Sequence, residues 1–411
     1  MTLSLEQRNA IFERTYMTVL KNYFDPQFNG KDWMNIAAAR KAAILGATDA
    51  VDFENQMHQL IRELGTSHTG FFHQDLRRVP GRLAIGATFR RCQVDDGPRW
   101  MFQDVHEGGP AQAAGIEPVD LLLEIDQHPI VAPEQPSFPM GTTSSLTVIK
   151  SNGHKVTVEI KIPKPRWKKQ PFAEPRTVSF RELDKNIGYL KTTIAPGIVG
   201  VDIAHEFDAA IAALAHCDRL IIDIRGFLGG GLGVLRLMSY MTPQKLPVGF
   251  SVTRRRAERG YRKEDLPRFE RLPSSKLAIP LLALRYLGRD ESVVLVTEGL
   301  GARKFHGRIV LLINEHTASA GEIVTAFALE NNLAVLVGSQ TAGRLLGGKG
   351  FRVGNGYLVI LPAAAFLTWK GASFEGEGVK PEVGVDWSPE AFRGGTDNQL
   401  DKAIQVAKGL Q

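Results

Sequence analysis

The most constraining feature of this sequence is an apolar stretch whose periodicity changes at one short turn. Residues 307–313 read Gly-Arg-Ile-Val-Leu-Leu-Ile, a run typical of a buried strand in a parallel sheet. Residues 323–330 are instead apolar at helical spacing. The turn between them, residues 314–322, reads Asn-Glu-His-Thr-Ala-Ser-Ala-Gly-Glu. A buried strand that turns directly into an apolar helix predicts an α/β core in this half of the chain.

Ser319 lies in this turn, where two interpretations compete. As a nucleophile, its hydroxyl would project out of the sheet beside the free N–H groups of the first helical turn. Those donors would hold the oxyanion of a tetrahedral intermediate. As an N-cap, the same hydroxyl would only complete the hydrogen bonding of the helix. The turn by itself leaves both interpretations open.

A second strand-turn-helix unit precedes the first one. Residues 219–224 predict a strand, residues 226–233 hold five glycines, and residues 235–241 predict a helix. Glycines at such a place allow close backbone approach and expose N–H groups. The cluster lacks the Gly-Lys-Ser/Thr of a phosphate-binding loop, so an oxyanion-hole role fits it better.

The first 76 residues predict helices, because their apolar residues recur at three- and four-residue steps. Two of these helical patterns cover Trp33–Leu45 and Val51–Leu64. Gly65 ends the last of them, and Thr66-Ser67-His68-Thr69 follows. A histidine in such a turn is either a surface or packing residue or a general base.

Residues 77–163 change to short strands separated by turns, with an Asn-Gly hairpin signal at residues 152–153. A small-residue helix at 108–116 precedes an Asp-led strand at 120–125. This order resembles the PDZ domain, which binds an extended peptide C-terminus by strand addition. The resemblance places the carboxylate-binding loop at Leu83, Ala84, Ile85 and Gly86, within a strand predicted for residues 83–90. The alternative is a small β-module that only packs against the rest.

The composition of the chain limits which classes of protein it can belong to. The chain of 411 residues is 43% hydrophobic and 23% charged, with a net charge of +6, as in ordinary globular proteins. No apolar run reaches the roughly 18 residues of a membrane span, and the first residues lack the apolar core of a signal peptide. We therefore expect a cytoplasmic protein, unless a leader was removed. The two cysteines, Cys92 and Cys217, predict neither a disulfide framework nor a zinc cluster. The basic run at residues 254–263 indicates a solvated face rather than a nucleic-acid site.

Taken together, these segments resemble the C-terminal processing (tail-specific) peptidases of family S41 and their tricorn-core and retinoid-binding-protein relatives. The motifs occur in the order Ser67-His68-Thr69, the PDZ-like module, Asp223-Ile224-Arg225 with its glycines, and Thr317–Glu322 followed by Thr341-Ala342-Gly343. The stretch 375–381, Glu-Gly-Glu-Gly-Val-Lys-Pro, completes the set. The resemblance implies a crotonase/ClpP-like α/β core and Ser319 as the nucleophile.

The family has two kinds of general base. In the processing-peptidase branch a lysine follows the downstream Thr-x-Gly, but this chain has Arg344 there, which cannot give up its proton. Lys349 lies five residues further on and is the lysine alternative. In the tricorn-like branch the base is a histidine after a serine, which matches Ser67-His68 here. The resemblance then implies that Glu375, with Glu377 as a near alternative, orients His68 through Ser67.

We therefore expect the chain to contain three domains: a helical region at 1–76, a PDZ-like domain at 77–163 and a peptidase core at 164–411. The core would begin with a linker at 164–171. The enzyme would be a serine endopeptidase that cleaves unstructured protein or peptide C-termini. Its oxyanion donors would be the N–H of Ala320 and that of Gly229 or Gly230. The resemblance implies no metal and no organic cofactor. The rival is an inactive binding or scaffold protein, favoured by Arg344 and by Phe227, which stands where the family often has asparagine.

Overall fold

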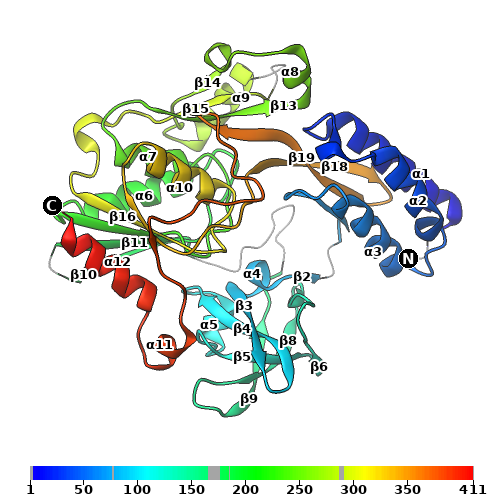
Figure 1. Ribbon diagram of the computed structural model, residues 1–411, viewed down its shortest axis with the longest axis horizontal. Helices are drawn as coiled ribbons and strands as arrows, with labels where there is room; N and C mark the ends of the chain where they lie inside the picture. Colours follow the sequence, from blue (N-terminus) through cyan, green and yellow to red (C-terminus); the bar gives the residue numbers. More distant parts are fainter. Residues whose placement is uncertain (1–2, 76–77, 165–175, 185, 287–290, 411) are drawn as a thin grey trace.

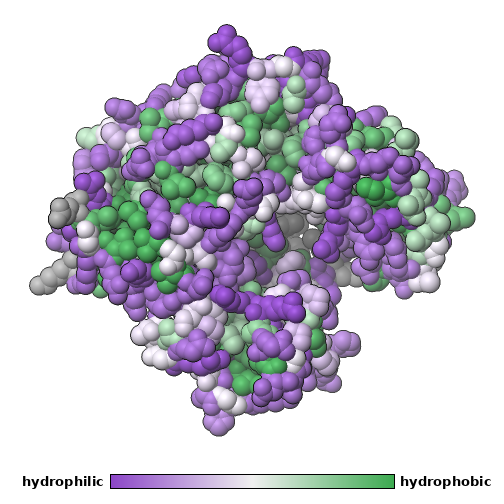
Figure 2. Space-filling model, viewed as in Figure 1, coloured by the Kyte–Doolittle hydropathy of each residue, from purple (hydrophilic) through white to green (hydrophobic). Residues whose placement is uncertain are grey.

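The computed structural model describes residues 3–75, 78–164, 176–184, 186–286 and 291–410. Apart from Lys164, the linker predicted for residues 164–171 lies outside the described residues. Figure 1 shows N-terminal helices on one side, a β-rich module at the bottom and a larger α/β body. No helix in these ranges is long and apolar enough to cross a membrane. Figure 2 shows a largely hydrophilic face with smaller apolar patches.

The N-terminal part consists of helices that begin at capping side chains. Ser4, Asp32 and Asp49 each accept a hydrogen bond from a backbone N–H of the first turn. The helices are α1 (Leu5–Asn22), α2 (Trp33–Leu45) and α3 (Ala50–Arg62). Their apolar faces share one core with strand β1 (Gly70–His73), strand β18 (Leu346–Gly354) and strand β19 (Tyr357–Thr368). Segments from the two ends of the sequence therefore fold together.

The β-rich module is built on a mainly antiparallel sheet with the order β3-β4-β5-β8-β9. Its sheet strands are β3 (Ala87–Val94), β4 (Gly97–Val105), β5 (Leu121–Ile125), β8 (Thr143–Ile149) and β9 (Lys155–Lys161), with β6 (His128–Pro129) paired to β5. Strands β2 (Arg78–Pro80) and β7 (Ser137–Pro139) pair separately, and the helices are α4 (Gly81–Ala84) and α5 (Pro110–Ala113). The strand predicted for residues 83–90 is wrong at its start, because Gly81–Ala84 forms a helical turn and β3 begins at Ala87.

The α/β body contains a mainly parallel sheet with the order β10-β11-β12-β16-β17-β20. The strands are β10 (Val178–Asp184), β11 (Ile187–Thr192), β12 (Arg219–Asp223), β16 (Arg308–Ile313), β17 (Val335–Gly338) and β20 (Val383–Gly384). One face packs against α6 (Val201–Ala213), α7 (Val234–Met241) and α10 (Ala320–Glu330). The other face packs against α12 (Asn398–Gly409). Covering both faces explains why the central strands β12, β16 and β17 are largely apolar and buried.

A second sheet joins the body to the N-terminal helices. Its order is β1-β19-β13-β15-β14, and β18 pairs with β19. The remaining strands and α-helices are β13 (Pro247–Thr253), α8 (Arg254–Arg259), β14 (Arg268–Phe269), α9 (Ile279–Tyr286), β15 (Val294–Val296) and α11 (Pro389–Arg393). Figure 1 shows β18 and β19 extending from the body toward α1 and α2. This long hairpin places the turn after α3 beside the body.

Candidate functional site

Ser319 lies where the sequence predicted, between strand β16 and helix α10. Its backbone has φ 54° and ψ −118°, a conformation that costs energy in a residue with a side chain. The residue is only partly buried, whereas its neighbours Ala318 and Ala320 are buried. The turn therefore exposes the serine hydroxyl at the amino end of an apolar helix.

The glycine loop after β12 reaches the same place, because β12 and β16 are parallel neighbours whose carboxyl ends share one edge. Gly229 faces Ser319 so closely that a Cβ on this glycine would lie 2.7 Å from Ser319 Cβ. In the part of the chain that the structure describes, no hydrogen-bond acceptor takes the N–H of Ala320, Gly229 or Gly230. Three backbone donors thus remain available around the serine.

The turn that carries Ser67 and His68 is held by Glu375, far along the chain. Ser67 donates two hydrogen bonds to the Glu375 carboxylate, from its N–H at 2.7 Å and from its hydroxyl at 2.9 Å. The Ser67 hydroxyl oxygen lies 2.8 Å from His68 Nδ1. The N–H of Leu345 also donates to Glu375, at 2.7 Å. Glu377, the near alternative, is exposed, and its backbone carbonyl accepts a hydrogen bond from the Gln340 side chain.

His68 and Ser319 line one cavity of about 720 Å³. No hydrogen bond joins these two side chains in the described structure, and catalytic hydrogen bonds are often longer in unliganded sites than in complexes. Burial lowers the pKa of His68, Glu375 raises it, and Arg344 lowers it, with a net shift downward. The imidazole is therefore neutral near pH 7 and able to accept a proton.

The two basic side chains of the downstream loop, those of Arg344 and Lys349, are not among the residues that line the cavity of Ser319. Lys349 is exposed on β18 and forms an ion pair with Glu291 at 2.5 Å. It does not line the cavity that contains Ser319. Arg344 is also exposed, while its backbone carbonyl accepts a hydrogen bond from the Ser319 N–H at 3.0 Å. The residue after Thr-x-Gly thus supports the serine turn through its backbone.

Glu322 is a supporting residue that we did not single out from the sequence. It is fully buried, and its carboxylate accepts hydrogen bonds from the Thr341 hydroxyl and from the N–H groups of Gly343 and Arg344, each at 2.7 Å. The N–H of Ser319 also donates to it, at 3.2 Å. Glu322 therefore ties the serine turn to the loop at residues 341–344. The sequence carried a signal for Glu322, because Ser319 followed three residues later by a glutamate is the capping-box pattern of a helix N-terminus.

The Asp223-Ile224-Arg225 motif is structural. Both charged side chains are buried, and Arg225 donates to Asp223 at 2.8 Å and to Asp397 at 2.7 Å. Asp397 caps α12, so the pair fastens this helix to the strand that leads into the glycine loop. Phe227 is buried too, and a Cβ on Gly321 would lie 2.9 Å from its ring. Phe227 thus packs beneath the serine turn.

The β-rich module contacts both turns of the site. Asn314, which precedes Ser319, accepts a hydrogen bond from the Gly226 N–H at 3.0 Å and donates to Asp104 of β4 at 3.1 Å. Arg82 of α4 donates to the carbonyls of Gly226 at 3.0 Å and Thr193 at 2.8 Å. These partners are distant in sequence, which explains why the sequence alone did not reveal them.

The predicted peptide-binding loop adjoins this interface. Leu83 lines the cavity that contains Ser319, whereas Ala84 and Ile85 are buried inside the module. Gly86 has φ 69°, and its carbonyl accepts a hydrogen bond from His106 at 2.9 Å. The loop directly precedes β3, which lies at an edge of the module's sheet.

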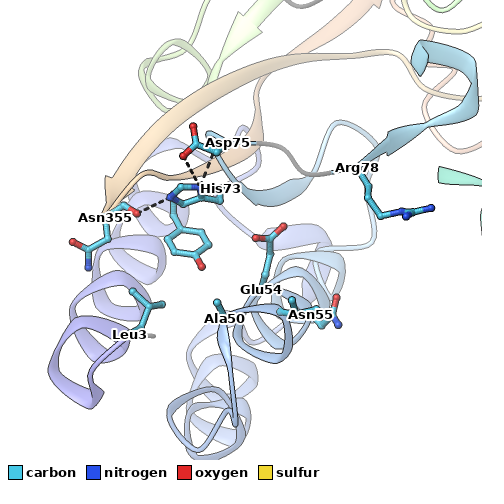
Figure 3. Close-up of a pocket in the computed structure, with 10 residues that line it drawn as sticks. Leu3, Ala50, Glu54, Asn55, His73, Asp75, Arg78 and Asn355 are labelled. Carbon is cyan, nitrogen blue, oxygen red and sulfur yellow. Dashed lines mark hydrogen bonds and ion pairs between the residues drawn. The ribbon is translucent and has the colours of Figure 1, made fainter. Parts of the chain in front are cut away.

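Two further features of the described structure contain polar side chains: a second cavity and a cluster of possible metal ligands. A cavity of about 540 Å³ lies between α3 and the β18–β19 hairpin, and Figure 3 shows His73 there between Asp75 and the carbonyl of Asn355. Among the described residues, Glu182, His216 and Cys217 form the only group able to hold a metal, with ligand atoms within 4.8 Å of one another. That group lies where β12 begins, at the opposite end of the strand from the glycine loop.

Comparison with known proteins agrees with this architecture. The family model described as Peptidase family S41 matches residues 186–385. Tricorn protease homolog 1 of Streptomyces coelicolor is 23% identical over 414 residues, which cover 97% of this chain and 35% of that protein. The chain thus spans about a third of the length of the first curated relatives that it matches.

Solved structures share the fold over the full chain. The photosystem II D1 C-terminal processing protease superposes with a TM-score of 0.58 at 16% identity, covering 97% of both chains. Mature CPAF complexed with lactacystin gives a TM-score of 0.60 at 15% identity, covering 98% of both chains. The solved structures support the fold, and the family model confirms the resemblance drawn from the sequence motifs, because residues 186–385 match peptidase family S41.

Proposed function

We propose that the protein is a serine endopeptidase of the C-terminal processing type, with Ser319 as nucleophile and His68 as general base. The observation that carries the proposal is the hydrogen-bonded chain Glu375–Ser67–His68, which ends in the cavity that contains Ser319. A structural N-cap would need no such chain. The strained backbone of Ser319 supports the same assignment, since residues in costly conformations cluster at active sites.

The chain of hydrogen bonds fixes the tautomer of the histidine. The Ser67 hydroxyl donates a hydrogen bond to Glu375, so its oxygen accepts a hydrogen bond from the N–H at His68 Nδ1. Nε2 then keeps its lone pair, as a base needs when it takes the proton of a serine hydroxyl. When His68 becomes charged, the carboxylate of Glu375 stabilises the imidazolium through Ser67. Ser67 and Glu375 are thus positioning residues.

The reaction follows from these positions. Ser319 Oγ attacks the carbonyl carbon of a peptide bond while His68 Nε2 takes the hydroxyl proton. The oxyanion accepts hydrogen bonds from the N–H of Ala320 and that of Gly229 or Gly230, which lack acceptors within the described residues. His68 returns the proton to the leaving amine, and water then releases the acyl group through the same base. No step needs a group from outside the chain other than water.

Substrate capture is assigned to the module around β3. A free sheet edge can add an extended peptide as a further strand, and β3 lies at such an edge. The loop Leu83–Gly86 would hold the terminal carboxylate. Support comes from Leu83, which borders the cavity of Ser319, and from Arg82, which links α4 to the glycine loop. The substrates would be unstructured protein or peptide C-termini.

The deciding experiment is labelling with a fluorophosphonate probe. We expect the wild-type protein to be labelled and Ser319→Ala to remain unlabelled. Intact-mass measurement of the labelled protein checks that one probe is bound per chain. Absence of labelling in the folded wild type would contradict the peptidase proposal and support an inactive binding protein. Labelling of Ser319→Ala at the wild-type rate would assign the nucleophile to another residue.

A further inference from the structure

The cavity at Ser319 continues well beyond the reacting groups. Its volume of about 720 Å³ lies within the range typical of ligand sites. Helices α7 and α10 and strands β15 and β19 contribute its walls. The apolar side chains that define these walls are Leu235, Met238, Val293, Leu295, Ile323 and Phe366.

The described lining contains no aspartate, glutamate, lysine or arginine. Three side chains in it are polar: Ser319, His68 and Ser251. The Ser251 hydroxyl donates to the carbonyl of Glu291 at 3.0 Å and accepts from the N–H of Val293 at 3.2 Å, so its hydrogen bonding is already satisfied. Away from the reacting groups, the cavity therefore offers a ligand apolar surface.

From this lining we infer that the cavity selects an apolar side chain on the residue whose carbonyl Ser319 attacks. The inference rests on the proposed function and names its substrate class. An apolar group gains free energy when it leaves water for such a surface, corresponding to about fourfold in affinity per methylene. A charged side chain would lose its hydration without finding a partner, and is therefore rejected.

We assign the acyl side of the substrate to the apolar walls of this cavity, and the leaving side to the part that His68 lines. Because His68 must return a proton to the leaving amine, the leaving part of the peptide lies next to the imidazole. Ile323 stands one helical turn after Ser319 on the same face of α10, so an apolar wall begins directly beside the nucleophile. The residue that becomes the new C-terminus therefore directs its side chain along α10 and α7. The size of the cavity favours leucine, methionine or phenylalanine over alanine.

Ile323 is the residue best suited to test this specificity. It is only partly buried, unlike Leu235 and Met238, so a larger or charged side chain there can point into the open cavity. Ile323→Glu places a carboxylate beside the bound side chain. We expect the preference to move toward lysine and arginine, because the carboxylate supplies the partner that a cation lacks in the native cavity. Leu281→Glu is the matched control, since Leu281 is 72% exposed on α9, outside the cavity.

The experiment measures hydrolysis of 4-nitrophenyl esters from acetate to hexanoate, with the rate of Ser319→Ala subtracted. We expect kcat/KM to rise about fourfold per methylene in the wild type and in Leu281→Glu. In Ile323→Glu the ratio of hexanoate to acetate rates should fall about tenfold or more. Mass spectrometry of a cleaved peptide library then identifies the new C-terminal residue, which should be leucine, methionine, phenylalanine or isoleucine.

The outcomes separate this inference from the proposal on which it rests. Ser319-dependent hydrolysis with no dependence on acyl chain length would overturn the specificity and leave the peptidase assignment standing. Charged residues at the new C-terminus, or apolar residues only at the new N-terminus, would do the same. If no substrate shows Ser319-dependent hydrolysis, the peptidase proposal fails and the inference fails with it. The wild-type measurements decide the matter even if Ile323→Glu does not fold.

Discussion

The carboxylate of Glu375 accepts a hydrogen bond from the hydroxyl of Ser67 at 2.9 Å, although 308 positions separate the two residues. The same carboxylate accepts from the N–H groups of Ser67 and Leu345, each at 2.7 Å. One side chain thus joins the turn after α3 to the loop that leads into β18. The placement of His68 therefore depends on this distant junction as well as on its neighbour Ser67.

The first prediction concerns the identity of the base. We expect His68→Ala to lower kcat/KM for an ester or peptide by about 10²–10⁴-fold, the usual contribution of a general base. Lys349→Ala should retain most of the activity, because Lys349 is exposed and paired with Glu291. Steady-state rates measured alongside fluorophosphonate labelling check both variants. A large loss in Lys349→Ala with little loss in His68→Ala would transfer the role to the lysine.

The second prediction separates the two neighbouring glutamates. Glu375→Gln should reduce kcat by about tenfold or more, because the amide no longer carries the charge that stabilises the imidazolium through Ser67. Glu377→Gln is the matched control, since the Glu377 side chain is exposed. A kcat-against-KM comparison tests the role, because a positioning residue affects kcat more than KM. Equal effects of the two substitutions would argue against the relay.

The third prediction is the pH dependence. Burial and Arg344 lower the pKa of His68, against the raising effect of Glu375. Because the neutral imidazole is the active form, activity should rise with pH through a midpoint below the usual value of about 6.5. Arg344→Gln removes a lowering influence and should move that midpoint to higher pH. Arg352→Gln, an exposed arginine at the other end of β18, is the control. A profile unchanged in Arg344→Gln would count against His68 as the titrating group.

The fourth prediction concerns stability. Burial acts to raise the pKa of Asp223, but Arg225 and Lys191 outweigh it and hold this pKa well below its usual range. Arg225→Met removes the main ionic partner of a buried carboxylate and should cost about 3–5 kcal/mol in the free energy of unfolding. Arg393→Met, which breaks an exposed ion pair with Glu390, should cost about 1 kcal/mol or less. Urea denaturation monitored by circular dichroism measures both.

The interaction of Asp223 with Arg225 also makes the free energy of unfolding depend on pH. Because the folded pKa of Asp223 is depressed, its contribution is complete above the unfolded value of about 3.9 and is lost as the pH falls below that value. We therefore expect the difference in stability between the wild type and Arg225→Met to shrink in acid. A difference that stays constant from pH 7 to pH 3 would contradict the role assigned to this pair.

The two central turns of the site could be predicted because each is formed by residues that are consecutive in the sequence. A buried strand, a short turn and an apolar helix occur in sequence order around Ser319 and around the glycines at 226–233, and parallel strands bring such turns to one edge. The roles of His68 and Glu375 could be predicted only from the family resemblance, because no local sequence pattern links these two residues.

Other features had no local signal at all. The contacts of Arg82 with Gly226 and of Asn314 with Asp104 join distant segments through single side chains. The hairpin of β18 and β19 begins at Leu346, where a series of glycines conceals the strand pattern in the sequence. Residues 243–305 gave no clear prediction, since their strands are short and their packing partners lie elsewhere.

Helices α1–α3 and the β18–β19 hairpin share one apolar core, so neither can be isolated or exchanged without the other. A fragment cut to the family match at 186–385 would expose the hairpin's apolar face and omit both the turn of His68 and the cap of α12. An exchange of the β18–β19 hairpin between relatives therefore has to include the N-terminal helices that cover its apolar face.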